Sequence, residues 1–481
     1  MVLIATIVVT STMALAATMP VPTTTALTIA LKRLIRTQFV AVRLQVCFSS
    51  LVRFGGAARA SFAPNGRLGW DWDVTEWFAL TVWGAVNYLR KATNLLTVER
   101  STTENYSNLN SQKLERIGSF KSGQDTGTGV LVRVDSPANN YPYGVTFPGY
   151  SSGRWSDGRI LIDFWAKILG LPYLDPFVKS GASSFSHGAN FACGGGTTTD
   201  KYASSAPFSF SLSLQLYQFR KFKSQVMETN RNQELFPGSQ QLKDCGSNLP
   251  PKSVFQDALY IVAVGANDIW YPVLQRTPIE EMRAAIPDIT ASIMRTIESL
   301  YEEGARNILV EDVYPLGCML LTIKDGNYTV YGDMGTLDSD GCVKLLDDLS
   351  RLHNSILKEE IAAFARKHSA DLSVALVETY SIRRDLMTNP VKYGFKYGME
   401  AACCGRNGIP GRYKSDEKCG KSQRAQPCTD PTEYVIWDGL HYTEAANKAI
   451  MKVILSGGHF HPQFPLSCNK SYLSDLANLP M

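Results

Sequence analysis

The sequence predicts an α/β fold in which helices cover both faces of a central parallel sheet. Continuous apolar stretches of strand length occur at residues 258–268, 307–317 and 372–381. Between them, apolar residues recur at spacings of three and four, the period of an amphipathic helix. A strand that is buried on both faces has a continuous run of apolar residues, whereas a strand with one solvent-exposed face alternates apolar and polar residues. Alternation of the two patterns along the chain therefore predicts the α/β class.

The expected elements follow one another in a regular order. Residues 258–268, "ALYIVAVGAND", form an apolar run that ends in a turn. We expect a long helix after it that stops at Gly304, then a buried strand at 307–317. A second long helix, marked by Leu345, Leu349, Leu352 and Ile356, leads to another strand at 372–381. The apolar face of the first helix consists of Met282, Ile286, Ile289, Ile293, Ile297 and Leu300.

Composition is that of a globular protein and gives little indication of its partners. The chain has 481 residues, of which 44% are hydrophobic and 19% charged, with a net charge of +4. Residues 1–70 contain seven Lys and Arg but no Asp or Glu, so the remaining chain is mildly acidic. We therefore expect no nucleic-acid surface on the globular part. The oligomeric state cannot be inferred from the sequence.

Residues 1–117 differ from the rest, and we expect a partly disordered N-terminal extension ahead of a domain at 118–481. The first residues, "MVLIATIVVTSTMALAAT", combine an apolar run with the cleavage-like Ala14-Leu15-Ala16, which predicts a signal peptide and secretion. The Arg-rich stretch that follows leaves organelle targeting open, and its basic amphipathic run leaves binding to a membrane surface open. Thr and Pro interrupt the apolar run, so no transmembrane span is expected.

Cysteines and glycosylation motifs agree with an oxidising compartment. Four cysteines crowd one stretch near residues 403–428, and two more bracket a loop. A zinc site is the alternative, but these four cysteines include no CxxC pair. Disulfides are therefore favoured, and no metal is expected. The disulfide candidates are Cys318, Cys342, Cys403, Cys404, Cys419 and Cys428. The candidate glycosylation sites are Asn105, Asn327 and Asn469.

Three short stretches carry residues suited to acyl-transfer chemistry. In "YVIWDGLHYTEAAN", Asp438 precedes His441 by three residues, a spacing that lets a carboxylate orient a general-base histidine from one turn. Asn267, at the end of a predicted strand, can donate its side-chain amide to an oxyanion, although an Asx turn or helix cap is the alternative. Gly158 lies in a loop before a helix and can aim its backbone N–H into a site, although an ordinary turn glycine is the alternative and Gly153 a less favoured substitute.

Together these stretches resemble the GDSL esterase/lipase family of plants, in the SGNH hydrolase superfamily. The resemblance covers roughly residues 118–465 and includes "FSHGANFACGGG", "VYPLGC" and "DGCVKLLDDLSRLHNSIL". It implies a three-layer α/β/α fold and hydrolysis of carboxylic esters by a Ser-His-Asp triad. Ser122 would be the nucleophile, His441 its base and Asp438 the orienting acid. The oxyanion hole would consist of the Ser122 and Gly158 N–H groups and the Asn267 side chain.

The nucleophile block departs from the family pattern. The family has Gly-Asp before the serine, whereas Phe120 and Lys121 stand here before Ser122 in "GSFKSGQDTGTG". A turn built for glycine should tolerate Phe120 poorly. The preceding residues 111–118, "SQKLERIG", are polar where the family has a buried strand, so we expect that strand to be missing.

Two functional interpretations remain open from the sequence. The first is a serine esterase that acts on lipid or small acyl esters without any cofactor. The second is a catalytically impaired relative that binds a ligand in the retained cleft. Both use Asn267, Asp438 and His441, so only the state of Ser122 distinguishes them.

Overall fold

The computed structural model describes residues 116–121, 125–132, 135–179, 183–202, 210–236, 248–324, 336–406 and 417–466. The predicted extension at 1–117 falls outside these ranges except for its last two residues, so its boundary stays a prediction. Within the described ranges, no helix is both long enough and apolar enough to cross a membrane.

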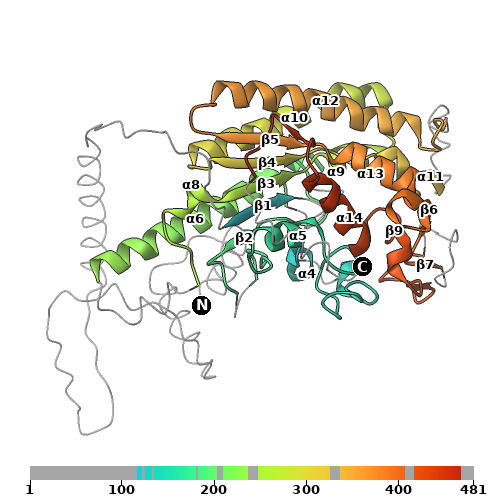
Figure 1. The fold of residues 1–481 in the computed structure, drawn as a ribbon, viewed down its shortest axis with the longest axis horizontal. Helices are drawn as coiled ribbons and strands as arrows, with labels where there is room; N and C mark the ends of the chain where they lie inside the picture. The colour runs from blue at the N-terminus through green and yellow to red at the C-terminus, as the bar shows by residue number, and fades with distance from the viewer. Residues whose placement is uncertain are drawn as a thin grey trace, which may run out of the picture. The chain divides into compact units, whose positions relative to one another are not determined.

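A six-stranded sheet forms the centre of the fold, with the strand order β10-β5-β4-β3-β1-β2 (Figure 1). All neighbouring strands are parallel except β10, which pairs antiparallel with β5 at one edge. The strands are β1 (Ile117–Lys121), β2 (Gly188–Asn190), β3 (Leu259–Ala263), β4 (Asn307–Glu311), β5 (Ser373–Val377) and β10 (Phe460–His461). The predicted α/β class with a mostly parallel sheet is confirmed.

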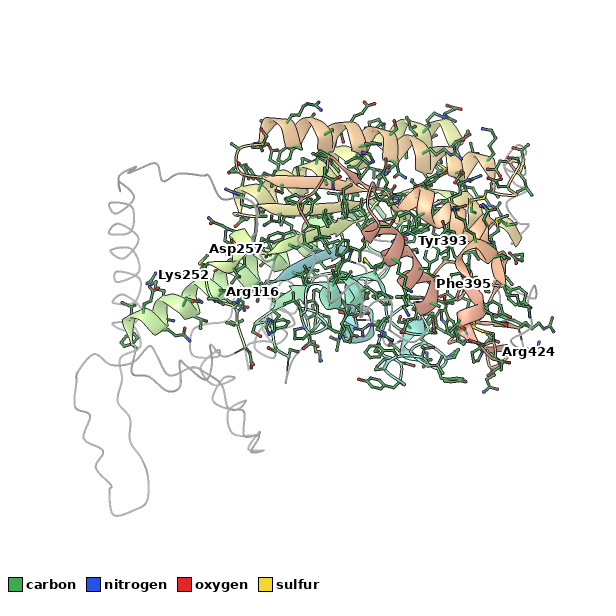
Figure 2. The ribbon with its side chains drawn as sticks, in the orientation of Figure 1. Arg116, Lys252, Asp257, Tyr393, Phe395 and Arg424 are labelled. Atoms are coloured by element: carbon green, nitrogen blue, oxygen red, sulfur yellow. A yellow bond between two sulfur atoms is a disulfide. The ribbon has the colours of Figure 1, made fainter. Side chains whose placement is uncertain are left out.

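Helices cover both faces of this sheet and make a three-layer α/β/α arrangement. One apolar cluster joins the strands to α6, α10 and α12. A second cluster joins the opposite face to α5, α13 and α14. The covering helices are α5 (Leu161–Ile168), α6 (Leu212–Leu235), α10 (Ile279–Glu302), α12 (Lys344–Lys367), α13 (Thr379–Thr388) and α14 (Glu444–Leu455). Their side chains fill the space between the layers (Figure 2).

Shorter elements complete the described fold. The short helices are α4 (Thr128–Val132), α8 (Val254–Asp257), α9 (Ala266–Leu274) and α11 (Leu320–Lys324). Two small two-stranded sheets pair β6 (Tyr397–Ala402) with β9 (Tyr434–Ile436) and β7 (Gly405–Arg406) with β8 (Ala425–Gln426). The 3₁₀ turns are Pro137–Asn139, Asp200–Tyr202, Leu316–Cys318, Pro390–Tyr393 and Pro431–Glu433.

The periodicity of α10 shows why the sequence prediction of the long helices was correct. All six apolar residues expected to share one face are buried. The helix ends at Glu302, and Gly304 adopts a positive φ of 97°, a conformation that glycine reaches without steric cost. The strand predictions were correct in place but too long, since β4 ends at Glu311 and β5 at Val377.

The expectation that the first strand is missing was wrong. β1 lies between β2 and β3 and pairs with β3 over five residues, from Ile117 with Leu259 to Lys121 with Ala263. Ile117, Ser119 and Phe120 are buried. Pairing to two neighbours satisfies the backbone, and the two large side chains supply apolar contacts on opposite faces of the sheet. A short strand can therefore form although the residues before it are polar.

The expected clash of Phe120 was wrong as well. Phe120 stands within β1, paired with Val262, and its ring is fully buried. The ring stacks on Phe191 at a centroid distance of 5.2 Å and meets Phe219 edge-on at 5.7 Å. An extended strand residue needs no glycine, so the aromatic side chain extends the core instead of distorting a turn.

Candidate active site

A cavity of about 260 Å³ lies at the carboxyl-terminal edge of the sheet, where ligands bind in open α/β folds. Its wall includes Ala263 at the end of β3, Glu311 at the end of β4 and His441 in the loop before α14. Arg116 and Asp257 lie at the opposite, amino-terminal edge (Figure 2). The topology thus gathers side chains that are far apart in the sequence.

His441 and Asp438 form a hydrogen-bonded pair on the cavity wall. The Nδ1 atom of His441 lies 2.7 Å from Oδ2 and 2.9 Å from Oδ1 of Asp438. The backbone N–H groups of Leu440 and His441 both donate to Asp438 Oδ1, which closes the turn. The carboxylate is buried, whereas the His441 side chain is 27% exposed. The pair therefore presents the other imidazole nitrogen, Nε2, to the open side.

Tyr143 is a third member of this group. Its hydroxyl donates to Asp438 Oδ2 at 2.5 Å. Burial acts to raise the pKa of Asp438, but the neighbouring His441 and the hydrogen bonds from His441 and Tyr143 outweigh it, so the pKa lies below its ordinary value. The carboxylate is thereby held ionised. Only an ionised carboxylate can stabilise the positive charge of an imidazolium.

Trp155 packs against the imidazole. Its ring lies 5.0 Å from the His441 ring, and Tyr143 meets Trp155 edge-on at 5.7 Å. The loop that carries Trp155 is fixed to the segment after His441, since Ser156 Oγ donates to the Tyr442 carbonyl at 3.0 Å and Glu444 N donates to Asp157 Oδ1 at 2.8 Å. These bonds restrict the orientation of the His441 imidazole.

Asn267 lies on the same cavity wall, in the first turn of α9. Gly265, with a φ of 114°, turns the chain from β3 into this helix. One hydrogen of the Asn267 amide is donated to the Gly196 carbonyl at 2.9 Å, which fixes the side chain and leaves a second N–H. The neighbouring Asp268 accepts from Thr198, so the loop after β2 is bound to the start of α9.

The six predicted disulfide cysteines are joined in three pairs: Cys318–Cys342, Cys403–Cys428 and Cys404–Cys419. All four sulfurs of the crowded stretch are used, so none is left to hold zinc as a thiolate. Among the described residues, no group of three His, Cys, Asp or Glu side chains is arranged to hold a metal ion.

Comparisons with known proteins show the family of the chain. The model of the GDSL-like lipase/acylhydrolase family matches residues 101–454. This chain belongs to the GDSL family. It is 34% identical over 360 residues to GDSL esterase/lipase ENOD8 of Medicago truncatula, with 73% of this chain and 87% of that protein covered. It is also 34% identical over 350 residues to an esterase of Hevea brasiliensis, covering 69% and 84% of the two chains.

Another plant relative carries a different name. Alpha-L-fucosidase 3 of Arabidopsis thaliana is 32% identical over 329 residues, covering 66% of this chain and 84% of that protein. The relatives named as esterases, together with the family model, make this chain a plant member of a family of carboxylic ester hydrolases.

Ser122, the nucleophile that the GDSL pattern predicts, lies outside the described residues, together with Gly123 and Gln124. Both flanks of this segment are tied to the cavity wall. Lys121 pairs with Ala263, which lines the cavity, and Asp125 Oδ2 accepts from the N–H of Gly194, which also lines it. Burial raises the pKa of Asp125 although four backbone N–H groups act to lower it. The chain therefore leaves β1 and enters α4 beside the site.

Gly158, predicted as an oxyanion donor, is not brought to the cavity. Its N–H donates to Ser156 Oγ at 3.3 Å, and a Cβ at this position would lie 2.1 Å from Glu444 Oε2. Glycine is thus needed for the close approach of Glu444, which also accepts from the backbone N–H of Arg159 at 2.6 Å. Gly153, the substitute, has a φ of 83° and is likewise absent from the described cavity wall.

Gly195, unlike Gly158, lies on the described cavity wall. It lines the cavity with a φ of 83°, and Tyr271 donates its hydroxyl to the Gly195 carbonyl at 3.1 Å. Within the described chain, no hydrogen bond is seen for its N–H. The run "CGGGTTT" after β2 was the available signal, because consecutive glycines permit close backbone approach to a ligand.

Tyr143 and Trp155 could not be found from spacing. Tyr143 is 295 residues from the aspartate it binds, and no local pattern links the two. Both residues lie in the aromatic stretch "YPYGVTFPGYSSGRW", which marks a packed loop without indicating what it packs against.

Proposed function

We propose that this chain hydrolyses carboxylic esters with Ser122 as nucleophile, His441 as general base and Asp438 as the acid that orients the base. The observation that carries the proposal is the His441–Asp438 pair on the cavity wall, with a 2.7 Å contact on Nδ1 and Nε2 left for a proton transfer. The positions of Lys121 and Asp125 support it, since only three residues join them.

In this mechanism His441 Nε2 takes the proton of the Ser122 hydroxyl as Oγ attacks the ester carbonyl. The alcohol leaves with that proton, and water then releases the acyl group by the same steps. The second amide hydrogen of Asn267 and the N–H groups of Gly195 and Ser122 serve as donors to the oxyanion. Gly158 is left out of this set because its N–H is engaged with Ser156.

The proposed substrates are esters with a small buried portion. A volume of about 260 Å³ is below the usual range for drug-sized ligands, which favours a short acyl or alcohol group over a full lipid chain. The chemistry needs no metal or organic cofactor, because the side chains supply both base and oxyanion donors.

We also propose that the protein is secreted and glycosylated. The three disulfides support an oxidising compartment. The sequons at Asn105, Asn327 and Asn469 all lie outside the described residues. Mass spectrometry of the protein from its native tissue, before and after glycosidase treatment, tests which of the three carries a glycan.

Hydrolysis of p-nitrophenyl acetate by the purified chain tests the catalytic proposal. Ser122→Ala and His441→Ala should each lower kcat by about 10³-fold or more. Ser119→Ala is the matched control, because this serine lies in β1 and its buried hydroxyl has no partner within the described chain. Activity that survives Ser122→Ala would contradict the proposal. A native chain that binds esters without hydrolysing them would favour the impaired relative.

A further inference from the structure

Arg383 is a buried cation that the proposed mechanism does not use. It lies on α13, is 6% exposed and lines the cavity. Within the described chain its guanidinium makes no hydrogen bond, and its Nε is buried without a partner. Its ion pair with Glu311, at 3.5 Å, is longer than a hydrogen bond of good geometry, so the Nε–H is left without an acceptor beside the site.

The neighbouring Arg384 shows the usual hydrogen bonding of an arginine in a folded protein, in which carboxylates accept from the guanidinium. Its guanidinium donates to Asp338, Asp340 and Asp347, each at 2.7 Å. Arg154, another buried arginine, donates twice to Asp163. Burying a polar group without hydrogen bonds is unfavourable, so the different state of Arg383 indicates that an acceptor enters from the cavity.

The surroundings of Arg383 define which acceptor fits. Its Nη2 lies 3.5 Å from Oε2 of Glu311, which also lines the cavity. The guanidinium stands over the rings of Tyr314 and Tyr442, at 5.7 and 5.3 Å from their centroids. The adjacent Asp312 already accepts from the first turn of α13.

Charge decides between classes of ligand group. An anionic group would be attracted by Arg383 but repelled by Glu311 at close range. A cationic group would be attracted by Glu311 but repelled by Arg383. A hydrocarbon would leave the guanidinium without an acceptor. A neutral hydroxyl can accept from Arg383 and donate to Glu311. The apolar remainder of such a group can lie against Trp155 and Trp270, which also line the cavity.

We propose that Arg383 and Glu311 form a subsite that binds a hydroxyl group of the substrate, so that the preferred substrate is an ester of a hydroxylated compound and not of a plain hydrocarbon. This inference rests on the proposed function of the same cavity and adds the substrate class. Arg383 acts on specificity and takes no part in bond breaking.

Two pairs of substrates test the subsite on either side of the ester: glycerol monoacetate against propyl acetate, and p-nitrophenyl 3-hydroxybutyrate against p-nitrophenyl butyrate. The native chain should prefer the hydroxylated member of at least one pair. Arg383→Met, which keeps the length of the side chain but has no donors, should reduce that preference by about 10- to 100-fold. Its kcat/KM should fall further on the hydroxylated member than on the plain member of the pair.

Arg384→Met is the matched control, because this neighbouring arginine is occupied by carboxylates. It should lower the melting temperature without changing the preference. A native chain with no preference in either pair, or a preference that survives Arg383→Met, would overturn the subsite.

Binding to the Ser122→Ala variant separates this inference from the proposed function. Saturation-transfer NMR should show at least one of the two hydroxylated esters, glycerol monoacetate or p-nitrophenyl 3-hydroxybutyrate, bound to Ser122→Ala and not to Ser122→Ala with Arg383→Met. If the native chain hydrolyses no ester yet this difference is seen, the hydrolase proposal fails and the subsite stands. Equal signals from the two variants with both esters would refute the subsite.

Discussion

Both carboxylate oxygens of Asp438 are occupied by donors, and this determines how the imidazole of His441 is held. Two backbone N–H groups bind Oδ1, the Tyr143 hydroxyl binds Oδ2, and the Nδ1 atom of the imidazole lies within 2.9 Å of both. A hydrogen bond from Nδ1 leaves Nε2 as the basic nitrogen. In the proposed mechanism Tyr143 is therefore a positioning residue that acts through Asp438.

Tyr143→Phe should lower kcat by about 3- to 30-fold with little change in KM, because it removes one donor to Asp438 and keeps the ring. The charge left on the carboxylate favours the protonated imidazole, so the acidic limb of the kcat/KM profile should move to higher pH. Tyr141→Phe, at a position 64% exposed, is the control. A loss of stability with an unchanged pH profile would show a merely structural role.

Asn267→Ala should lower kcat by about 10²- to 10³-fold, since one oxyanion donor is lost. The amide also bonds the Gly196 carbonyl, so the melting temperature of the variant must be measured with the kinetics. A large rise in KM with kcat unchanged would mean that Asn267 binds the ground state and does not stabilise the transition state.

At the scale of single elements, β1 depends on a few large side chains. Phe120 is enclosed by Phe191 and Phe219, and the helix layer of α6 covers it. Glycine or alanine at this position would leave a cavity in the core. Restoring the family residues, Phe120→Gly with Lys121→Asp, should therefore unfold the strand and not improve the site.

Phe120→Ala should lower the free energy of unfolding by about 3–5 kcal/mol, the usual cost of truncating a buried phenylalanine. Phe236→Ala, at the 60% exposed end of α6, should change it by less than about 0.5 kcal/mol. Urea unfolding followed by circular dichroism measures both. Equal effects of the two changes would show that β1 is not packed as the structure has it.

The long elements could be predicted from sequence because their signal is local. The buried face of α10 and the apolar run of β3 are visible in windows of 5 to 20 residues. β1 could not, because its stability depends on pairing with residues 259–263 and on aromatic contacts from α6. A strand supported by tertiary contacts carries little propensity of its own.

The same distinction separates the predicted and missed parts of the site. Asp438 and His441 share one turn, so their spacing indicated the pair. Gly195 and Tyr143 lie in two separate loops and Arg383 lies on α13, and only the folded topology brings these three segments together. Gly158 had a suitable sequence context but is used for the approach of Glu444, a contact that no spacing predicts.

At the scale of the whole molecule, folding buries carboxylates that water would otherwise keep ionised. Burial raises the pKa of Asp268 from 3.8 to about 7, against the lowering effect of its bonds to Thr198. Between these two pH values the folded chain holds a proton that the unfolded chain has released. This contribution to stability is therefore full below about pH 4 and is lost as the pH rises toward 7.

Asp268→Asn keeps an oxygen acceptor for Thr198 but cannot titrate. The free energy of unfolding of the native chain, minus that of the variant, should fall by on the order of 3 kcal/mol between pH 4 and pH 7. Denaturant unfolding at several pH values measures this difference. If the difference in unfolding free energy instead rises with pH, the hydrogen-bond donors stabilise the ionised carboxylate by more than burial destabilises it.

Covalent labelling of Ser122 tests the central claim most directly, because an alkyl fluorophosphonate reacts only with a serine that a neighbouring base activates. The native chain is treated with the reagent, and the modified peptide is identified by mass spectrometry, beside His441→Ala. The triad predicts a single adduct on Ser122 that forms at least about 10³-fold more slowly in the variant. No adduct on Ser122, or an adduct that forms equally fast without His441, would contradict the account.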